Sequence, residues 1–550
     1  MGEFGNRHSN CCPFFCTSPP RGTPAKSGCK SPLDIVHAMN YRIISKYLGI
    51  VALIVAAAMV VSIPWVFPVF GGSRTFERNA FIGLLASACL SAGIGAMLYF
   101  AGRKSTSVLL RKETMAIVGL SWILASILGA LPFLIGRVYR EEGQPMTITD
   151  ALFESASGFS GTGATVITDL EDPDMVARAI LFWRSETHFL GGLGIMVLFV
   201  AVLGHGSAGK ALMRAEMPGP TKETGQNRTQ HAAWVFTTIY LVLNAILITL
   251  LLIQGMSPFD AICHAFGTIA TGGFSTYNDS VAHFHHVGIE MTIAVFMVLA
   301  CTNFTLLYLL TLGKVRQVFA DIEFRTYLVV LAVATGLVVC FGMIHVDFGS
   351  WRDAFRYGFF QVASILTNTG FTTHNFDQWN EIGRGALFLL MFVGGCAGST
   401  SCSVKIIRHV LFGKILWREL ERAYRPSVVR PLRVGGEPIE DAAIVNSVLV
   451  YFALLLVIFV VAWFSFDCIE PDHVWSDLGR APHEKLVDIA SGVGATLNGV
   501  GPGLGTIGAV ENYAHFQPAS KLLFVLLMLL GRLELYVILV LFLPRFWRAH

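Results

Sequence analysis

Four similar segments of the chain each join a short, moderately apolar stretch to a turn rich in glycine and threonine. Long apolar runs separate the four segments. They read DALFESASGFSGTGATV (150–166), DAICHAFGTIATGGFST (260–276), DAFRYGFFQVASILTNTGFTT (353–373) and VDIASGVGATLNGVGPG (487–503). An internal repeat governs the architecture, because each copy forms the same structural unit. The sequence therefore predicts a unit of span, short helix, glycine turn and span, used four times.

The apolar runs predict a membrane protein. Hydrophobic residues make up 54% of the 550 residues and charged residues 14%, whereas soluble domains average about 25% charged residues. Several runs exceed the roughly 18 apolar residues that indicate a spanning helix. We predict ten spans, at about 46–70, 80–102, 113–137, 178–204, 230–254, 287–312, 325–346, 383–413, 441–465 and 519–543.

The charges of the connecting loops predict the orientation. Loops 102–113, 209–228, 313–325 and 405–433 are basic, whereas loop 466–484 is acidic. Basic loops stay on the cytoplasmic side of a membrane. Both chain ends are therefore expected in the cytoplasm, which agrees with an even number of spans.

The predicted fold class is an all-α polytopic membrane protein. Residues 1–38 are polar and are expected to be a disordered extension, with Met39 as an alternative start. A two-helix preface follows at 39–104. The four pore repeats are predicted at 105–215, 216–318, 319–432 and 433–550.

The glycine-rich turns predict a cation site whose ligands are backbone carbonyl oxygens. Non-helical backbone at membrane depth must be buried in protein or line a water-filled cavity. Four converging strands could present rings of carbonyl groups that replace the water shell of a monovalent cation, with the negative ends of the short helices aimed at the same place. Asp150, Asp260 and Asp353 are expected as N-caps of those helices, with or without a modest effect in concentrating cations at the outer mouth.

Further motifs connect the chain with a known family. They are GTGATV, LFWRSETHFLGGLGIMVL (181–198), TIATGGFST (268–276), TNTGFTT (367–373), GGCAGSTSCSVKIIR (394–408), ATLNGVGPGLG (495–505) and GRLELY (531–536). With these motifs the chain resembles the Trk/Ktr/HKT superfamily of potassium transporters, and most of all the bacterial Trk type. The resemblance extends from about residue 40 to the C-terminus.

The resemblance implies a selectivity filter for K⁺ with four repeats around one path. Carried over by position, Gly163, Gly272, Gly370 and Gly501 are the central glycines. The flanking carbonyl donors are Gly161, Thr162, Ala270, Thr271, Asn368, Thr369, Gly499 and Val500. In related plant proteins a serine in place of the first central glycine accompanies sodium preference, so Gly163 favours potassium. Gly161 and Gly499 replace a common threonine and a common asparagine, which leaves the carbonyl groups but predicts a looser filter.

The resemblance also implies a gate beneath the filter. Small and polar residues interrupt the span 383–413, and a loop that includes Gly398, Ser399 and Thr400 would obstruct the path. Close helix packing is the alternative for these residues. Arg532 is expected to project into the cavity below, or else to pair with a carboxylate of another helix; Glu534 is only two positions away and faces elsewhere. Arg184, Glu186 and His188 are expected to form a polar network between helices.

The expected partners follow from the same resemblance. The chain has no room for a nucleotide-binding domain, so a separate cytosolic regulator with Rossmann-type domains would hold the nucleotide. Loops 205–228 and 405–433 are its candidate docking surfaces, with anionic lipid as the alternative ligand. A homodimer in the inner membrane is expected. No covalent cofactor, transition metal or nucleic acid is expected.

Other functions remain open at this stage. Passage of both Na⁺ and K⁺, and symport driven by sodium or protons, would need the same filter, and a scaffold or sensor with a dead pore is not excluded. The motif GFSG (158–161) also occurs in intramembrane serine proteases. The protease predicts a single such site, whereas here the turn recurs four times.

Overall fold

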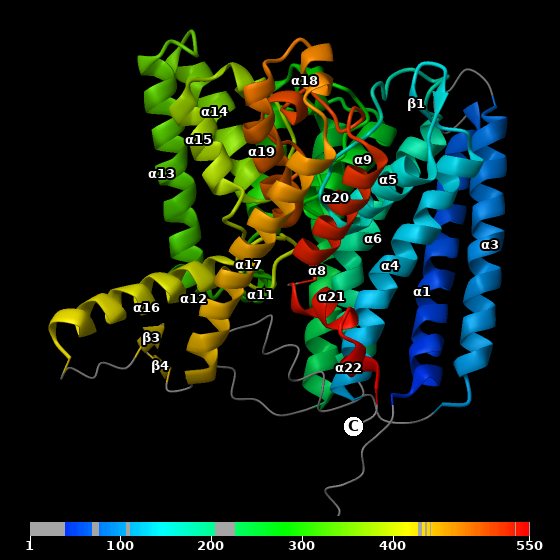
Figure 1. The fold of residues 1–550 in the computed structure, drawn as a ribbon, viewed down its shortest axis with the longest axis horizontal. Helices are drawn as coiled ribbons and strands as arrows, with labels where there is room; N and C mark the ends of the chain where they lie inside the picture. Colours follow the sequence, from blue (N-terminus) through cyan, green and yellow to red (C-terminus); the bar gives the residue numbers. More distant parts are fainter. Residues whose placement is uncertain are drawn as a thin grey trace, which may run out of the picture.

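The computed structural model describes residues 39–68, 76–105, 110–203, 226–426, 432–434, 437–439, 442–533 and 535–548. Residues 1–38, Glu534 and most of loop 205–228 lie outside the described residues. The described chain forms a bundle of helices (Figure 1). Two short antiparallel hairpins accompany it, β1 (Tyr139–Glu141) with β2 (Gln144–Pro145) and β3 (Leu432–Val434) with β4 (Glu437–Ile439). The predicted all-α polytopic fold is confirmed.

The first two helices pack closely side by side. They are α1 (Tyr41–Ser62), which continues as a 3₁₀ turn to Val66, and α3 (Arg78–Gly102). The backbone of α3 leaves no room for a side chain at Gly49 of α1, and α1 likewise excludes one at Gly102. Small residues at such contacts let two helices approach closely within a membrane. The predicted two-helix preface is this pair.

The next helices form the first and second units. The first unit contains α4 (Arg111–Ile135), the short α5 (Ile148–Ser160) and α6 (Arg178–Leu203). The second contains α8 (Gln226–Ile253), the short α9 (Pro258–Ile269), η2 (Ser280–Phe284), α10 (Val287–Ala300), α11 (Phe304–Thr311) and α12 (Val315–Ala320).

The third and fourth units follow the same order. The third contains α13 (Ile322–Ile344), α14 (Trp351–Leu366), η3 (Phe376–Gln378), α15 (Glu381–Leu390) and α16 (Ile406–Tyr424). The fourth contains α17 (Ala442–Ile469), α18 (His473–Asp477), η4 (Pro482–Glu484), α19 (Lys485–Asn498), η5 (Gly505–Ile507), α20 (Pro518–Arg532), α21 (Tyr536–Leu541) and α22 (Pro544–Trp547).

Several predicted spans are broken. Six described helices are long and apolar enough to cross a membrane, and α10 with α11 makes a seventh candidate that bends by 105°. The sequence predicted a break only within 383–413, where α15 ends at Leu390 and α16 then lies across the bundle (Figure 1). The spans predicted as continuous at 287–312 and 519–543 are also interrupted. Hydropathy misses these breaks because each contains only a few polar or charged residues, such as Thr302 and Asn303, between long apolar runs.

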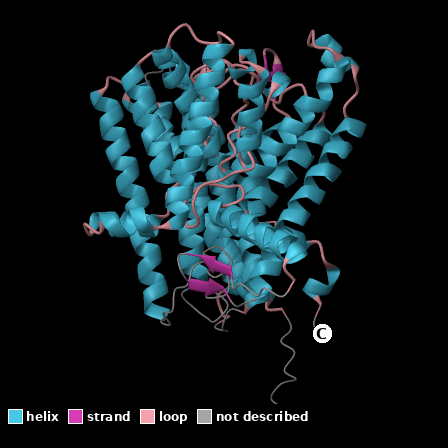
Figure 2. Ribbon diagram, turned by 90° about the vertical axis from the view of Figure 1, so that its left-hand side faces the viewer, coloured by secondary structure: helices cyan, strands magenta, loops and turns pink. Residues whose placement is uncertain are grey.

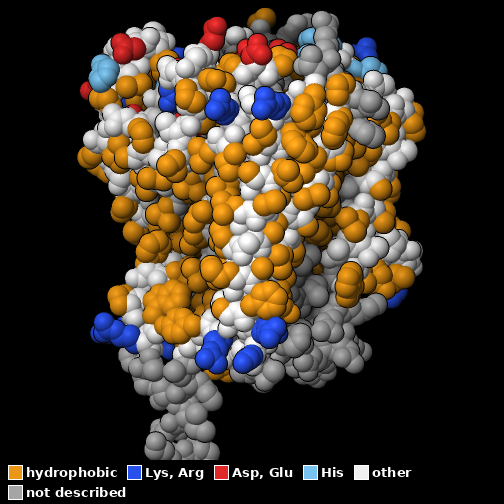
Figure 3. Space-filling model, turned by 90° about the vertical axis from the view of Figure 1, so that its right-hand side faces the viewer, with side chains coloured by type: hydrophobic (Ala, Val, Ile, Leu, Met, Phe, Trp, Pro, Cys, Tyr) orange, Lys and Arg blue, Asp and Glu red, His pale blue; other side chains and the backbone are white. Residues whose placement is uncertain are grey.

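The surface and the interior agree with a position in a membrane. On the face shown in Figure 3, hydrophobic side chains form a broad band; acidic side chains appear only above it, whereas lysines and arginines appear both below it and near its upper edge. The first and last described segments meet at the basic end, where the rings of Tyr41 and Trp547 stack. Loops descend through the middle of the bundle (Figure 2). We call the acidic end the outer end and the basic end the inner end.

Candidate ion pathway

Each short helix, α5, α9, α14 and α19, ends in a turn with the same backbone geometry. We number these turns first (161–166), second (271–276), third (368–373) and fourth (499–504). The opening residue of each turn has a positive φ, and the next N–H donates to a carbonyl five residues back. These bonds are Thr162 to Ser157, Gly272 to Gly267, Thr369 to Ser364 and Val500 to Ala495, at 3.0, 2.8, 2.9 and 2.8 Å. The opening residues are Gly161, Thr271, Asn368 and Gly499, with φ of 71, 54, 59 and 70°.

This geometry corrects the alignment of the second turn by one residue. Gly272 was matched with Gly163, but its hydrogen bond makes it the equivalent of Thr162. The equivalent of Gly163 is Gly273, since the two have φ of 82 and 79°. Asp260 lies thirteen positions before Gly273, the interval that separates Asp150 from Gly163. The doubled glycine concealed this spacing from the sequence alignment.

The four turns adjoin one another in cyclic order. A methyl group added to each central glycine would meet the backbone of the next turn. The contacts run from Gly163 to the carbonyl of Gly272, from Gly273 to the carbonyl of Thr369, from Gly370 to the nitrogen of Gly501 at 3.1 Å, and from Gly501 to the oxygen of Gly163 at 2.8 Å. The sequence of contacts returns to its starting point. Glycine is needed because a Cβ atom would push the ring apart.

A single cavity opens above this ring. It has a volume of about 80 Å³, and one central glycine from each turn lines it: Gly163, Gly273, Gly370 and Gly501. Tyr277, Glu511 and Tyr513 also stand on its wall. Three of the predicted filter residues, Gly163, Gly370 and Gly501, therefore line one shared space, and Gly273 takes the place that was predicted for Gly272.

Hydrogen bonds between neighbouring units hold the outer side of the ring. They join the four units in the same cyclic order, and we call them the collar. Leu170 N–H donates to Asn278 at 2.8 Å, Ala282 N–H to the Thr372 carbonyl at 3.1 Å, Gly505 N–H to Asp377 at 2.9 Å and Tyr513 N–H to the Thr165 carbonyl at 2.8 Å. The collar closes because its last bond connects the fourth unit with the first.

Buried polar side chains of α6 support the first two turns. Arg184 pairs with Glu154 of α5 and donates to the Ser275 carbonyl at 2.8 Å. The His188 ring lies between the Gly158 carbonyl, 2.7 Å from Nδ1, and the Phe274 N–H, 3.1 Å from Nε2. Because the Phe274 N–H donates to Nε2, the ring proton must be on Nδ1.

The remaining member of the predicted network is Glu186. It accepts a hydrogen bond from Ser62 at 2.6 Å and so joins α6 to α1. The three predicted polar side chains therefore all bond neighbouring segments, but Glu186 faces α1 whereas Arg184 and His188 face α5 and the second turn, so they do not form one connected network.

The aspartates near the outer mouth are not N-caps, contrary to the prediction. The caps are Thr147, Ser257 and Ser350, whose hydroxyl groups accept the N–H of the aspartates three residues later. Asp150 is 1% exposed and pairs with Lys521 at 2.6 Å, and Asp260 accepts from Thr276 at 2.8 Å. Hydroxyl caps suit these positions, and in α5 Asp150 completes a capping box from the third helical position. Buried and paired in this way, Asp150 and Asp260 do not line the mouth as free charges.

Beneath the turns lies a segment without regular structure, which we call the inner loop (391–405). Three of its side chains contact the inner ends of short helices: Thr400 donates to the Ile269 carbonyl at 3.0 Å, Cys402 to the Ser160 carbonyl at 3.4 Å and Ser403 to the Asn498 side chain at 2.9 Å. The predicted gate residues Gly398, Ser399 and Thr400 all belong to it. Gly398 accepts from the Phe304 N–H at 3.2 Å, and Ser399 bonds the Cys396 carbonyl within the loop.

Arg532 lies against the inner loop. It is 5% exposed, and its guanidinium donates to the Thr400 carbonyl at 2.8 Å, to Cys402 Sγ at 3.1 Å and to the Gly191 carbonyl at 3.0 Å. A side chain at Gly161 would come within 3.8 Å of it. These hydrogen-bond partners are neutral, so Arg532 places a positive charge directly below the first turn. Glu534, two positions after Arg532, lies outside the described residues.

The inner loop is also fixed from its inner side. Glu323 of α13 accepts from the Ala397 N–H at 2.8 Å and the Ile407 N–H at 3.1 Å. Lys405 bonds the Ser401 carbonyl and precedes α16 as its N-cap residue. Glu323 therefore holds the middle of the loop and the start of α16, and Lys405 holds the second half of the loop.

The sequence analysis missed Asn278, Asp377, Tyr513 and Glu323. The first three build the collar, but they follow the turns at different distances and so share no repeated spacing. Glu323 could have been found, because an acid at the start of an apolar run requires a partner. Within the described residues, no group of three or more His, Cys, Asp or Glu could hold a metal ion.

Comparisons with known proteins match almost the whole chain. The sequence model of a family described as TrkH, cation transport protein, matches residues 79–549. The Trk system potassium uptake protein TrkH of Escherichia coli (strain K12) is 35% identical over 519 residues, which cover 93% of this chain and 100% of that protein. The protein of the same name from Vibrio parahaemolyticus is 36% identical over 462 residues, which cover 83% of this chain and 90% of its own length. The crystal structure of the potassium transporter TrkH from Vibrio parahaemolyticus has a TM-score of 0.78 and 31% identity and covers 93% of this chain and 100% of its own.

Proposed function

The chain belongs to the TrkH cation transport protein family, and from this premise we propose that it takes up potassium ions through the passage that the four turns enclose. The family is one of transport proteins, so the protease suggested by GFSG is set aside. The observation that carries the proposal is the closed ring of turns with one cavity above it. Non-helical backbone at membrane depth must be buried in protein or line a water-filled cavity. Four such turns that meet around one cavity are therefore best explained as the wall of a common path.

Backbone oxygen is the proposed ligand. The filter would comprise Gly161, Thr162 and Gly163; Ala270, Thr271 and Gly272, extended by Gly273; Asn368, Thr369 and Gly370; and Gly499, Val500 and Gly501. No carboxylate belongs to these turns, which suits a monovalent ion that sheds its water rather than a divalent one. The short helices direct their negative C-terminal ends at the same place. Their support of a cation adds to that of the carbonyl groups.

The proposed gate is the inner loop together with Arg532. The loop contacts short-helix ends directly beneath the turns, so ions that leave the filter would meet it first. The guanidinium adds a fixed positive charge there, which opposes the approach of a cation. Opening would require Thr400 and Cys402 to separate from Arg532, and this explains why the loop contains so many small residues.

The surroundings of the protein are part of the proposal. The chain is the membrane subunit of an uptake system in the inner membrane, with both termini and the basic inner end in the cytoplasm, following the positive-inside rule. A cytosolic regulator with Rossmann-type nucleotide-binding domains would dock on loops 205–228 and 405–433. Residues 204–225 and 427–431 of these loops lie outside the described residues. A homodimer is proposed by family membership.

Two measurements test the function. The gene should restore growth on low potassium to a bacterium that lacks its own uptake systems; absence of growth, with the protein present in the membrane, would contradict the proposal. Purified protein in liposomes should then admit potassium under a potassium gradient alone. A requirement for a sodium or proton gradient would instead establish symport, and equal entry of Na⁺ would establish a filter that does not discriminate.

A further inference from the structure

The fourth turn holds its central carbonyl group in a way that the other turns do not. Gly163, Gly273 and Gly370 have φ between 79 and 83°, whereas φ at Gly501 is not positive. Gly501 precedes Pro502, and a proline restricts the backbone of the residue before it. The Gly501 carbonyl oxygen accepts a hydrogen bond from the Tyr513 hydroxyl at 2.9 Å.

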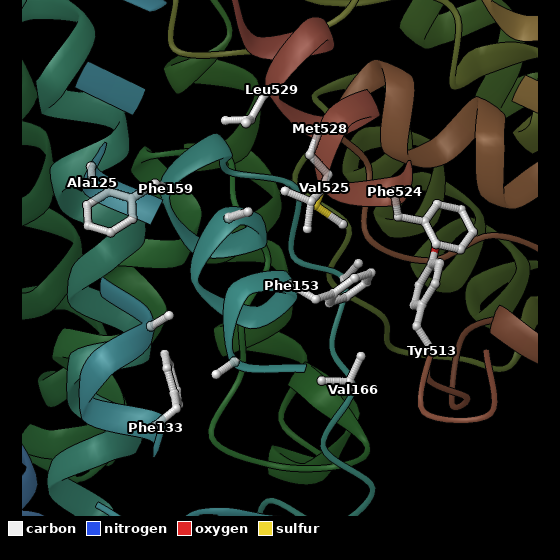
Figure 4. Close-up of a cluster of buried hydrophobic side chains, with 14 of the residues drawn as sticks. Ala125, Phe133, Phe153, Phe159, Val166, Tyr513, Phe524, Val525, Met528 and Leu529 are labelled. Carbon is white, nitrogen blue, oxygen red and sulfur yellow. The ribbon is translucent and has the colours of Figure 1, made fainter. Parts of the chain in front are cut away.

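The position of Tyr513 is fixed on several sides. Its N–H forms the collar bond to the Thr165 carbonyl at 2.8 Å. Its ring packs against Phe153 and Phe524 (Figure 4), with centroids 5.4 and 5.2 Å away. The Phe516 ring lies 5.9 Å away, and Tyr513 is 2% exposed. A buried tyrosine hydroxyl needs a partner, and the surrounding rings offer none. The hydroxyl is therefore held on the Gly501 carbonyl.

The bond lies where an ion would enter. Gly501, Pro502 and Tyr513 all line the cavity above the ring. A carbonyl oxygen that accepts a hydrogen bond has part of its electron density engaged and moves less freely. Discrimination between K⁺ and Na⁺ depends on the number and field strength of the carbonyl dipoles around the ion. A change at one of four carbonyl groups is thus enough to alter the preference.

We propose that Tyr513 is a positioning residue that favours potassium over sodium by holding the Gly501 carbonyl; the proposal rests on the potassium pathway inferred above. With the hydroxyl in place, the fourth turn offers a weaker and more rigid ligand than the other three. Without it, the freed carbonyl presents a stronger field and can move inward, and both changes favour the smaller Na⁺ ion.

The test compares ion competition in purified protein reconstituted into liposomes. Uptake of ⁸⁶Rb⁺ is measured against rising external Na⁺ for the unmodified protein and for Tyr513→Phe, which keeps the ring and its packing. The Na⁺ concentration that halves uptake should fall about two- to tenfold, the factor equivalent to one hydrogen bond. A purely structural role would lower the rate or the yield and leave the competition unchanged.

The matched control is Tyr327→Phe. Tyr327 is also fully buried, and its hydroxyl donates to the Val298 carbonyl at 3.3 Å, within a helix rather than a turn. The Na⁺ concentration that halves ⁸⁶Rb⁺ uptake should be the same for Tyr327→Phe as for the unmodified protein. An equal response of the two variants would overturn the inference and leave the proposed function standing, because the unmodified protein would still take up ⁸⁶Rb⁺. If the unmodified protein takes up none, the proposed function fails and the inference fails with it.

A second measurement covers the case in which Tyr513→Phe is stable but transports nothing. Thermal unfolding in detergent, with increasing KCl or NaCl at constant ionic strength, reports ion binding without transport. For Tyr513→Phe, the Na⁺ concentration needed to raise the melting temperature by a given amount should fall relative to the K⁺ concentration that has the same effect, by the same factor. An unchanged ratio would overturn the inference.

Discussion

Behind the first turn lies a buried ion pair, whereas the fourth turn is backed by apolar and aromatic side chains. Glu154, which pairs with Arg184, lies nine residues before its central glycine. Gly492 has that position in the fourth unit, where Ile507 and Phe524 fill the space. The N–H three residues after the central glycine donates to Glu154 in the first turn, at 3.1 Å, and to the Ser491 hydroxyl in the fourth, at 2.8 Å.

The comparison of the first and fourth turns shows which features both turns share and which differ between them. Both turns keep the hydrogen bond to a carbonyl five residues back and a glycine facing the neighbouring turn. Both also satisfy the same N–H, one with a charged acceptor and the other with a neutral one. The backbone geometry is therefore the constant, and the side chains behind it can vary between units. Such variation gives each unit its own influence on the ion.

Replacing a central glycine should reduce Rb⁺ uptake more than any of the other substitutions. The reduction should be larger in the first turn than in the fourth. Gly163→Ala places a side chain at φ 82° against the Gly272 carbonyl, and the left-handed conformation alone costs about 1–2 kcal/mol. Rb⁺ uptake should fall by more than about tenfold. Gly501→Ala avoids the unfavourable φ and meets the Gly163 oxygen at 2.8 Å, so its loss should be smaller. Gly336→Ala, with nothing within 4 Å, is the control; equal losses at Gly163 and Gly501 would contradict the distinction.

The supports behind the turns should differ in their contribution to stability. Glu154→Gln leaves Arg184 buried without its partner charge, which should lower the free energy of unfolding by about 3–5 kcal/mol. Ser491→Ala removes only neutral hydrogen bonds, from the Leu504 N–H and to the Asp488 carbonyl, which should cost about 1–3 kcal/mol. Thermal unfolding in detergent measures both. Glu381→Gln breaks an ion pair whose carboxylate is 88% exposed and should change little; a Glu154 variant as stable as this control would refute the role of the buried pair.

Below the ring, Arg532 connects the fourth unit with the first, as Tyr513 does above it. It extends from the end of α20 to the Gly191 carbonyl of α6. Arg532→Ala removes the positive charge below the first turn and frees the Thr400 carbonyl, so the rate of Rb⁺ uptake should rise severalfold. Arg532→Lys keeps the charge and should stay near the original rate. A rate that is unchanged or reduced in the alanine variant would place the arginine outside the path.

The parts of the molecule that could be predicted are those that repeat. The four turns, the preface and the polar side chains around His188 each have a signal in composition or spacing, so they were found without a structure. The Gly272 assignment was wrong because two adjacent glycines fit the pattern equally well, and only the hydrogen bond to Gly267 separates them. The three carboxylates at the helix starts were placed one turn too early in their helices, since the hydroxyl caps before them were not considered.

The collar could not be predicted, and the reason is physical. Asn278, Asp377 and Tyr513 act between units that are distant in sequence, and each bonds a backbone group of a neighbour. A backbone partner imposes no residue type, so the sequence carries no paired signal for these contacts. The broken helices were missed for a related reason. The backbone groups freed at a break are satisfied by neighbouring segments, as the Phe304 N–H is by the Gly398 carbonyl, and the few polar residues at the break barely change the hydropathy of the whole run.

The smallest predicted effect concerns Asp377, which joins the third unit to the fourth in the collar. Burial raises the pKa of the Asp377 carboxyl above its usual value, although hydrogen bonds from Gly505 and Ala509 and the charges of Arg384 and Arg480 act in the opposite direction. The folded protein therefore binds this proton more tightly than the unfolded chain, so the free energy of unfolding decreases as pH rises from the ordinary aspartate pKa through the raised one. Asp377→Asn removes this dependence. Across the mildly acidic range, the melting temperature of the original protein should fall with rising pH relative to that of the variant, by a few degrees at most. Two parallel plots of melting temperature against pH would mean that the hydrogen bonds and positive charges around Asp377 offset its burial, and would contradict the raised pKa.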